Sequence, residues 1–452
     1  MYAIDPRADS QQEFPRSIQL AALEEYLGDD EIQTICCQYR SHWRDRLFPP
    51  GLTVRSLVWR GLSHDRSIAN VLADLAANDP RFAEEGTASA WCQARHRLPQ
   101  QLWPEVITRS ARRAQALAGS RHLYHGRPVY ITDGSSLSML DEPGLVQVFG
   151  YANTRHGRSR FPVARITFLA QAGLQVIWDY RLDPYTTAED TQFQHMWDRI
   201  PKNAICLFDR HFSSFYNLAK LRQRGVDASS RLNQRRDAGK LIRYGKKIGK
   251  NQWLVTFYLA PQLRKKYNDP SLPESLQVRL IRVWFYRGQK RHIFWLVTTL
   301  LDSQAYPMQE IVQWYRRRWT IETRIGSIKT TLQLNVLRSK TESAVRCEVA
   351  ATILAHNLIW LLIHQAAAQE DIPADRISFA GAIKLVVACS QWLAMIGGIR
   401  RKILYQRMLK SIARQTNRHR PDRVEPRLLK RELARFAYLR TSRQQARVKC
   451  LS

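Results

Sequence analysis

The chain has 452 residues, of which 44% are hydrophobic, and it carries 70 Lys and Arg against 39 Asp and Glu, a net charge of +31. This much apolar sequence excludes a wholly disordered chain, and about three domains are expected at roughly 150 residues per domain. Positive charge on this scale favours a polyanionic partner, with nucleic acid first and an anionic membrane surface second.

The cysteine spacing and the apolar stretches predict the cellular compartment of the protein and whether it spans a membrane. The seven cysteines have no C-x-x-C spacing and no Cys/His zinc pattern, so reduced thiols in a cytosolic protein are expected. No signal peptide is expected, because the N-terminus lacks a basic region followed by an apolar run. The apolar stretches 349–368 and 380–399 contain polar residues such as Asn357 and Lys384. They are therefore predicted to be buried helices and not membrane spans.

Residues 1–118 are predicted to be helical, because apolar residues recur three and four positions apart. The expected helices are 17–27, 53–62, 67–77 and 103–117. Basic side chains recur throughout this segment, which fits a helical DNA-binding domain. An ordinary helical domain with a solvated basic face fits the same pattern equally well.

From about residue 121 the apolar pattern changes to that of a mixed α/β domain. Strands are predicted at 128–132, 164–170, 174–181 and 204–208, and helices at 188–199 and 213–224. Residues 233–300 contain three more strand-like runs, at 253–259, 277–285 and 292–298, and are predicted to form a β-rich insertion.

A long helix is predicted at 308–332, and two apolar helices follow it. Residues 400–449 then hold 17 Lys and Arg against three acids. A tail this basic either contacts nucleic acid or is solvated and partly disordered. The predicted domains are a helical DNA-binding domain (1–118), the first part of an α/β core (119–232), the insertion (233–300), the second part of the core (301–370) and a helical, basic C-terminal region (371–452).

Two acids stand out by their context. Asp133 and Asp209 each follow a short apolar run that is predicted to be a buried strand. A carboxylate at the carboxyl end of a strand lies at the rim of a sheet, where sites gather in α/β folds, and Mg²⁺ prefers carboxylate oxygens. An Asp in this place also commonly starts a turn or caps a helix, and for either residue alone this is the simpler interpretation.

The predicted helix 308–332 supplies a third acid. At 100° per residue, Glu322 shares a narrow band with Tyr315, Arg318 and Lys329 at the edge of the apolar face. An intrahelical ion pair explains Glu322 with Arg318, but it does not explain the other two. The neighbouring acids of the α/β core, Glu189 and Asp190, are predicted to be surface residues.

The spacing Tyr315-x2-Arg318-x3-Glu322-x6-Lys329 matches the Y-(2)-R-(3)-E-(6)-K signature, and the chain resembles the DDE insertion-sequence transposases of the IS-four family. Residues 130–135 (YITDGS) resemble the first catalytic segment of that family, and 207–212 (LFDRHF) resemble the second, usually D-R-[GN]-F, with His211 as a departure. Residues 155–165 (RHGRSRFPVAR) resemble its H-G-R-S-x-[YF]-P-x-x-R stretch. The resemblance covers about residues 85–365 and leaves out the basic tail.

This resemblance implies an RNase H-like catalytic core in which three acids bind two Mg²⁺ ions, with Mn²⁺ as a possible substitute. The implied catalytic and metal-binding residues are Asp133, Asp209 and Glu322. The implied DNA-binding residues are Tyr315, Arg318, Lys329, Arg165 and Arg210, with Trp295 of the insertion stacking on a flipped base. For Trp295, a place in the core of a strand is an equal alternative, and Trp253 and Trp284 are weaker candidates.

The expected function is cut-and-paste transposition, in which the protein binds the inverted-repeat ends of its own element, cleaves them by metal-dependent hydrolysis and transfers their 3′-OH groups to target DNA. We expect a homodimer on paired ends in the cytoplasm of a prokaryote, associated with the nucleoid, and no membrane partner, because basic residues are spread over every segment. The alternatives are a related RNase H-like nuclease or recombinase that does not transpose and a DNA-binding protein without catalysis.

Overall fold

The computed structural model describes residues 28–40, 46–120, 122–154, 157–287 and 290–417, together with Leu23, Tyr26, Trp43, Gln444, Gln445 and Val448. Most of the predicted helix 17–27 and most of the basic tail therefore lie outside the described residues. The chain divides into two compact units, which are described separately. The helical unit comprises Met1–Arg113 and Ser343–Asp422, and the sheet unit comprises Ala114–Glu342 and Arg423–Ser452.

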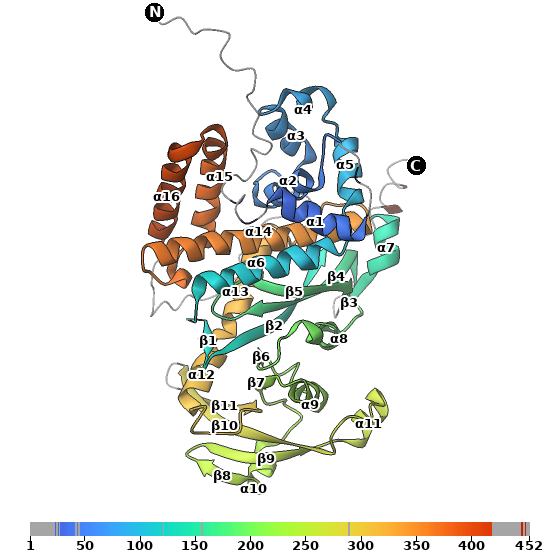
Figure 1. Cartoon of the computed structure of the whole chain (residues 1–452). Helices are drawn as coiled ribbons and strands as arrows, with labels where there is room; N and C mark the ends of the chain where they lie inside the picture. The colour runs from blue at the N-terminus through green and yellow to red at the C-terminus, as the bar shows by residue number, and fades with distance from the viewer. Residues whose placement is uncertain are drawn as a thin grey trace, which may run out of the picture. The chain divides into compact units, whose positions relative to one another are not determined.

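The helical unit confirms three of the predicted N-terminal helices as α2 (Pro50–Leu62), α3 (Ile68–Ala76) and α6 (Leu102–Ala118), the last of which ends in the sheet unit (Figure 1). Three further helices were not predicted, namely α1 (Asp29–Tyr39), α4 (Pro80–Glu85) and α5 (Ala88–Arg97). The C-terminal part adds α14 (Glu342–Gln369), the short η3 (Ala374–Arg376), α15 (Phe379–Met395) and α16 (Gly398–Arg414).

Helix α14 is the core helix of this unit. Among the described residues it alone has the length and hydropathy of a membrane span, and its most apolar window is 100% buried within the fold. Burial on all sides is what a core helix requires, so the prediction for 349–368 is confirmed. The prediction for 380–399 holds for one face only, because α15 leaves Trp392 and Met395 exposed.

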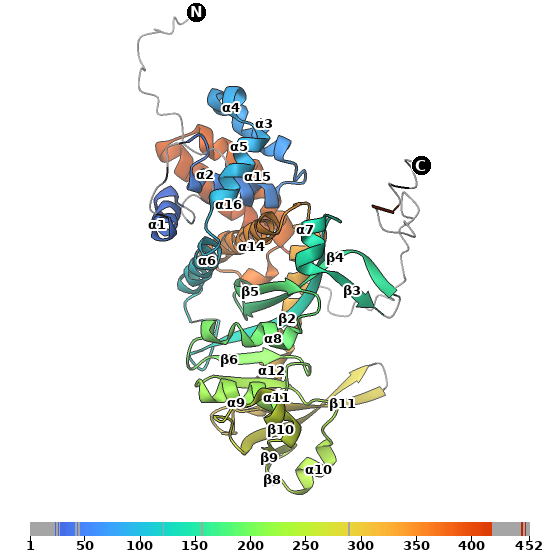
Figure 2. The same cartoon turned by 90° about the vertical axis from the view of Figure 1, so that its right-hand side faces the viewer.

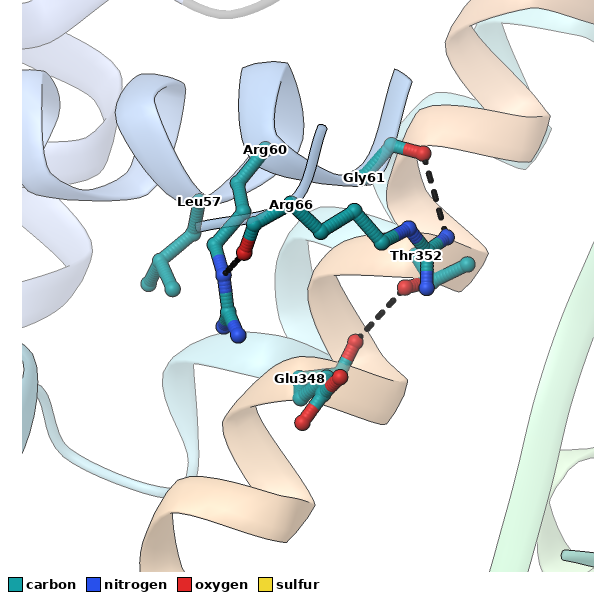
Figure 3. Close-up of a pocket in the computed structure, with 6 residues that line it drawn as sticks. All are labelled: Leu57, Arg60, Gly61, Arg66, Glu348 and Thr352. Atoms are coloured by element: carbon teal, nitrogen blue, oxygen red, sulfur yellow. Dashed lines mark hydrogen bonds between the residues drawn. The ribbon is translucent and has the colours of Figure 1, made fainter. Parts of the chain in front are cut away.

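Charged side chains lie between α2 and α14 (Figure 3). Arg60, Arg66 and Glu348 are each at most 7% exposed and line a cavity of about 10 Å³, room for about one water. Arg60 Nε donates to the carbonyl of Arg66 at 2.7 Å, and Arg66 Nη2 donates to the carbonyl of Gly61 at 3.2 Å. These bonds hold the end of α2 and the segment after it together, so we assign this cluster a structural role.

The sheet unit is built on one sheet, in which the described residues form eleven strands. Its long path runs β3-β4-β2-β6-β7-β11-β10-β9-β8, while β5 pairs with β4 and β1 with β2. The strands of the first half are β1 (Leu123–Tyr124), β2 (Arg127–Ser138), β3 (Tyr151–Thr154), β4 (Gly157–Gln171), β5 (Ile177–Pro184), β6 (Ile205–Phe208) and β7 (Asp227–Arg231). Strands β2, β4 and β5 are antiparallel neighbours, whereas β6 and β7 run parallel to β2.

The strands of the predicted insertion continue this same sheet. They are β8 (Lys246–Gly249), β9 (Gln252–Tyr258), β10 (Ser275–Arg287) and β11 (Lys290–Thr298), and the last three confirm the predicted runs. Strand β11 pairs with β7 through Leu296 and Arg231. Strands β10 and β11 run together as a long ribbon (Figure 2). Strand β7 was not predicted, because its sequence, Asp-Ala-Ser-Ser-Arg, is polar although four of its five residues are buried.

The helices of the sheet unit are α7 (Pro143–Phe149), α8 (Glu189–Gln194), η2 (Trp197–Arg199), α9 (Phe215–Gln223), α10 (Ala238–Arg243), α11 (Pro261–Tyr267), α12 (Met308–Arg317) and α13 (Trp319–Thr330). The prediction of a single helix at 308–332 is wrong in one respect, because the structure divides this segment into two helices at Arg318. There the backbone bonds tighten to three-residue spacing, from Arg318 N to Tyr315 O and from Ile321 N to Arg318 O. Apolar periodicity does not reveal a tightening of one turn.

Candidate active site

Two aspartates meet where strand β6 ends beside β2. In the parallel pairing, Ile131 is opposite Leu207, and β6 ends one residue later at Phe208. Asp133 and Asp209 therefore come at the same level, each two residues after this last pair of the two strands. This is the carboxyl edge of parallel strands, where ligand sites form in α/β sheets.

The first and last residues of the Y-R-E-K signature, Tyr315 and Lys329, attach helices α12 and α13 to this edge of the sheet. The Tyr315 hydroxyl donates to the carbonyl of Phe208 at 3.4 Å, one residue before Asp209. Lys329 Nζ donates to Ser135 Oγ at 3.0 Å and to the carbonyl of Ser136 at 3.1 Å, just beyond Asp133. Glu322 lies between these two attachments, so the fold brings the third acid toward the two aspartates.

The pKa of Asp133 is raised by burial and by the neighbouring acids. Burial raises the pKa of Asp133 to about 6, and the negative charges of Glu322 and Asp209 add to the shift. The hydrogen bond from the backbone N–H of Gly134, at 2.9 Å, and the charge of Arg318 oppose it. The charges of Glu322 and Asp209 therefore act on Asp133, and Asp133 and Glu322 share Arg318 as a neighbouring cation.

Arg318 is nearly inaccessible in this state. It is 5% exposed, and its guanidinium lies 4.9 Å from the ring centre of Trp319. Its Nη2 bonds Glu322 Oε1 at 3.3 Å, while the Glu322 side chain remains 45% exposed. Arg318 thus holds the third acid in place, and its predicted DNA contact stays a prediction.

The donor chemistry of the site fits a hard divalent cation. All three acids offer carboxylate oxygens, the ligands that Mg²⁺ and Mn²⁺ prefer. Within the part of the chain that the structure describes, however, no three His, Cys, Asp or Glu side chains lie together closely enough to hold an ion. Each carboxylate instead has a protein donor, which is Gly134 N–H for Asp133, His211 N–H for Asp209 and Arg318 for Glu322. The three acids would have to move closer together to hold one ion jointly.

The other predicted DNA-binding residues lie in different surroundings. Arg210 is exposed beside Asp209. Arg165 has a side chain only 20% exposed, which pairs with Glu189 at 3.5 Å and lies 4.5 Å from the ring centre of Tyr185. Trp295 is half-buried, 5.5 Å from the ring of Trp253, whereas Trp284 on the neighbouring strand is 42% exposed.

The prediction that Glu189 and Asp190 are surface acids is wrong. Both are half-buried at the start of α8, and burial raises the pKa of Asp190, which accepts a hydrogen bond from Gln194 at 3.2 Å. The carboxylate of Glu189 lies directly against Gly134. A signal for this contact was present in the sequence, because a glycine within a strand often marks the close approach of another group.

The pKa of Asp133 predicts how metal binding depends on pH. Protons and divalent cations compete for the same carboxylate, so Mn²⁺ affinity should fall as the pH is lowered through about 6, whereas an ordinary Asp loses its charge near pH 4. The folded state also holds this proton more tightly than the unfolded state does. The stability of the metal-free protein should therefore fall as the pH rises from about 4 through about 6.

Electron paramagnetic resonance of free Mn²⁺ measures the affinity directly. A constant affinity between about pH 7 and about pH 5 would contradict the raised pKa of Asp133.

Comparisons with known proteins show the family of this chain. Residues 124–358, more than half of the chain, match the family model described as the transposase DDE domain. The chain is 24% identical over 379 residues to the transposase InsG for insertion sequence element IS4 of Escherichia coli, which covers 81% of this chain and 82% of that protein. It is 32% identical over 118 residues to the putative transposase InsZ of the same organism, which covers 25% of this chain and 40% of that protein.

Among solved structures, the piggyBac transposase in a synaptic complex with hairpin DNA aligns with 90% of this chain and 88% of its own, at 8% identity and a TM-score of 0.43. The family match and the length of the alignment to InsG carry the assignment. The chain belongs to the DDE transposases of the IS-four family, and it is a DNA transposase.

Proposed function

We propose that this transposase moves its own element by cut and paste. It binds the inverted-repeat ends, cleaves them by hydrolysis and joins the freed 3′-OH groups to target DNA. The observation that carries this proposal is the approach of Asp133, Asp209 and Glu322 at one edge of the sheet, where their charges interact. The strand order β5-β4-β2-β6-β7, three antiparallel strands followed by two parallel ones, supports an RNase H-like core.

The three acids are the proposed ligands of two Mg²⁺ ions, with Mn²⁺ as a substitute. Bound there, such ions would stabilise charge on the transferring phosphoryl group and on the oxygens that attack and leave. The protein's own groups prepare the site before DNA arrives. Tyr315 and Lys329 fix α12 and α13 on the sheet, and Arg318 orients Glu322.

The same cations are proposed to hold the reacting DNA strand. Arg210 is exposed beside Asp209 and can meet a phosphate directly, whereas Arg318 becomes available only when Glu322 turns toward a metal ion. Contacts of Tyr315, Arg318, Lys329, Arg165 and Arg210 to the backbone would position DNA without reading its sequence. Trp295 is proposed to stack on an unpaired base, an interaction worth about 1–3 kcal/mol.

Paired ends require two catalytic centres, so we propose a homodimer that forms on DNA in the cytoplasm of a prokaryote, at the nucleoid. The net charge of +31 supports strong attachment to the DNA backbone. The helical unit, which holds the N-terminal helices, is the proposed reader of the end sequence.

A strand-transfer assay tests the function. The purified full-length protein is mixed with linear DNA bearing the sequences that flank its coding region, a target plasmid and Mg²⁺. We expect breaks at the ends and products joined to the plasmid, and neither in EDTA nor with scrambled ends.

The alternatives give different results in the same assay. Breaks without joined products would favour a nuclease, and a gel shift without breaks would favour a DNA-binding protein that lacks catalysis. Equal cleavage of scrambled ends would contradict end-specific transposition.

A further inference from the structure

Gly134 lies between two carboxylates. On one side, Asp133 Oδ1 accepts the Gly134 N–H at 2.9 Å. On the other, the carboxyl carbon of Glu189 lies 2.4 Å from the place of a Cβ atom, and both its oxygens lie 2.7 Å from it. A side chain at position 134 would therefore meet the Glu189 carboxylate and displace it.

The first turn of α8 fixes Glu189 in this position. Gln192 is fully buried, and its amide donates to the carbonyl of Arg165 at 3.0 Å and to Asp183 Oδ2 at 2.9 Å. Its Oε1 accepts the hydroxyl hydrogen of Thr167 at 2.6 Å. Because Thr167 is directly opposite Gly134 in the β2–β4 pairing, these bonds hold the helix on the face of the sheet to which Gly134 belongs.

Packing alone does not account for a charged group here. The Glu189 side chain is 27% exposed, and its cation, Arg165, is 3.5 Å away, beyond the usual length of a charged hydrogen bond. An acid in the first turn of a helix is favourable, but that effect does not explain why the carboxylate lies against Gly134 of the sheet. The carboxylate instead lies against the backbone of Gly134, the residue that directly follows Asp133.

We propose that Glu189 is a fourth carboxylate of the metal centre, a positioning residue that lies behind Gly134 and acts through Asp133. This inference rests on the proposed function of the three acids. Its charge strengthens the attraction for divalent cations, and its contact with Gly134 restrains the segment that carries Asp133. Loss of such an outer partner typically weakens metal affinity about 10–100-fold.

The test compares Glu189→Gln with the parent protein by Mn²⁺ binding, measured from the paramagnetic resonance of the free ion without DNA. We expect at least about tenfold weaker binding, with an unchanged melting temperature in the absence of metal. Glu310→Gln is the matched control, because the Glu310 side chain is 44% exposed and pairs with His125 at 2.8 Å, and this variant should bind Mn²⁺ as the parent does. Parental affinity in Glu189→Gln would overturn the proposal.

A double-mutant cycle separates this role from a simple effect on Asp133. Gly134→Ala should displace Glu189 and weaken Mn²⁺ binding about as much as Glu189→Gln does. In a Glu189→Ala background the space is open, so the added methyl group should cause no further loss. An equal loss in both backgrounds would mean that the methyl group acts on Asp133 directly, and would overturn the proposal.

Asp133→Asn distinguishes the proposed role of Glu189 from the proposed metal site itself. Weak Mn²⁺ binding in Asp133→Asn together with parental binding in Glu189→Gln would refute the role of Glu189 alone. Parental binding in Asp133→Asn would refute the proposed metal site, and the role of Glu189 with it.

Discussion

Asp133→Asn is expected to abolish Mg²⁺-dependent cleavage of end-bearing DNA. Asparagine keeps the shape of the side chain but removes the charge that attracts the cation. Metal ions contribute several kcal/mol to transition-state stabilisation, and each 1.36 kcal/mol is tenfold in rate, so a loss of about 10³-fold or more is expected. The measurement is the rate of cleavage of labelled DNA at saturating Mg²⁺. Glu322→Gln should behave in the same way.

Binding to DNA should survive these substitutions, because the basic residues remain, and a gel shift in EDTA checks this. Asp198→Asn is the control, since Asp198 lies on η2, pairs with Arg224 after α9, and has a side chain that is 86% exposed. It should cleave as the parent does. Full cleavage by Asp133→Asn would show that this carboxylate is not a metal ligand of the reaction.

The sequence predicted those parts of the site that follow from local periodicity. A short apolar run that ends in Asp predicts a strand with a carboxylate at its end. The structure confirms this setting for Asp209, whereas Asp133 lies within β2, which continues to Ser138. Helical spacing likewise placed Glu322 and Lys329 on one side of α13. The sequence did not predict that Lys329 would bond to Ser135, because that contact depends on how the helix crosses β2.

The features that the sequence did not predict, strand β7 and the position of Glu189, depend on contacts between distant segments. Strand β7 has no apolar pattern, since the hydroxyls of Ser229 and Ser230 are buried in bonds to Thr298 and Ser213 at 2.7 and 2.8 Å. Glu189 looked like any acid at the start of a helix. Its contact with Gly134 arises only once β2, β4 and α8 have assembled.

The largest effect on stability is expected at the amino ends of the same parallel strands. Asp227, the first residue of β7, bonds Arg127 Nη2 at 2.7 Å, Arg222 Nη1 at 2.8 Å and the Thr299 hydroxyl at 2.6 Å. Arg127, the first residue of β2, also donates to the carbonyl of Asn203 at 2.9 Å. Both members of the pair are at most 7% exposed. This cluster joins β2, β6, β7 and β11 at one end of the core.

Asp227→Ala should therefore lower the free energy of unfolding of the sheet unit by about 3–5 kcal/mol, because it leaves the buried guanidinium of Arg127 without its counter-ion. Hydrogen exchange of the β6 and β7 amides measures this loss for the sheet unit separately from the helical unit. Glu274→Ala, which breaks an exposed pair with Arg264, should leave the exchange unchanged. Adding Arg127→Met to Asp227→Ala removes the stranded charge, so the double variant should recover part of the loss. If it is no more stable than Asp227→Ala, the penalty comes from lost packing and not from the unpaired charge.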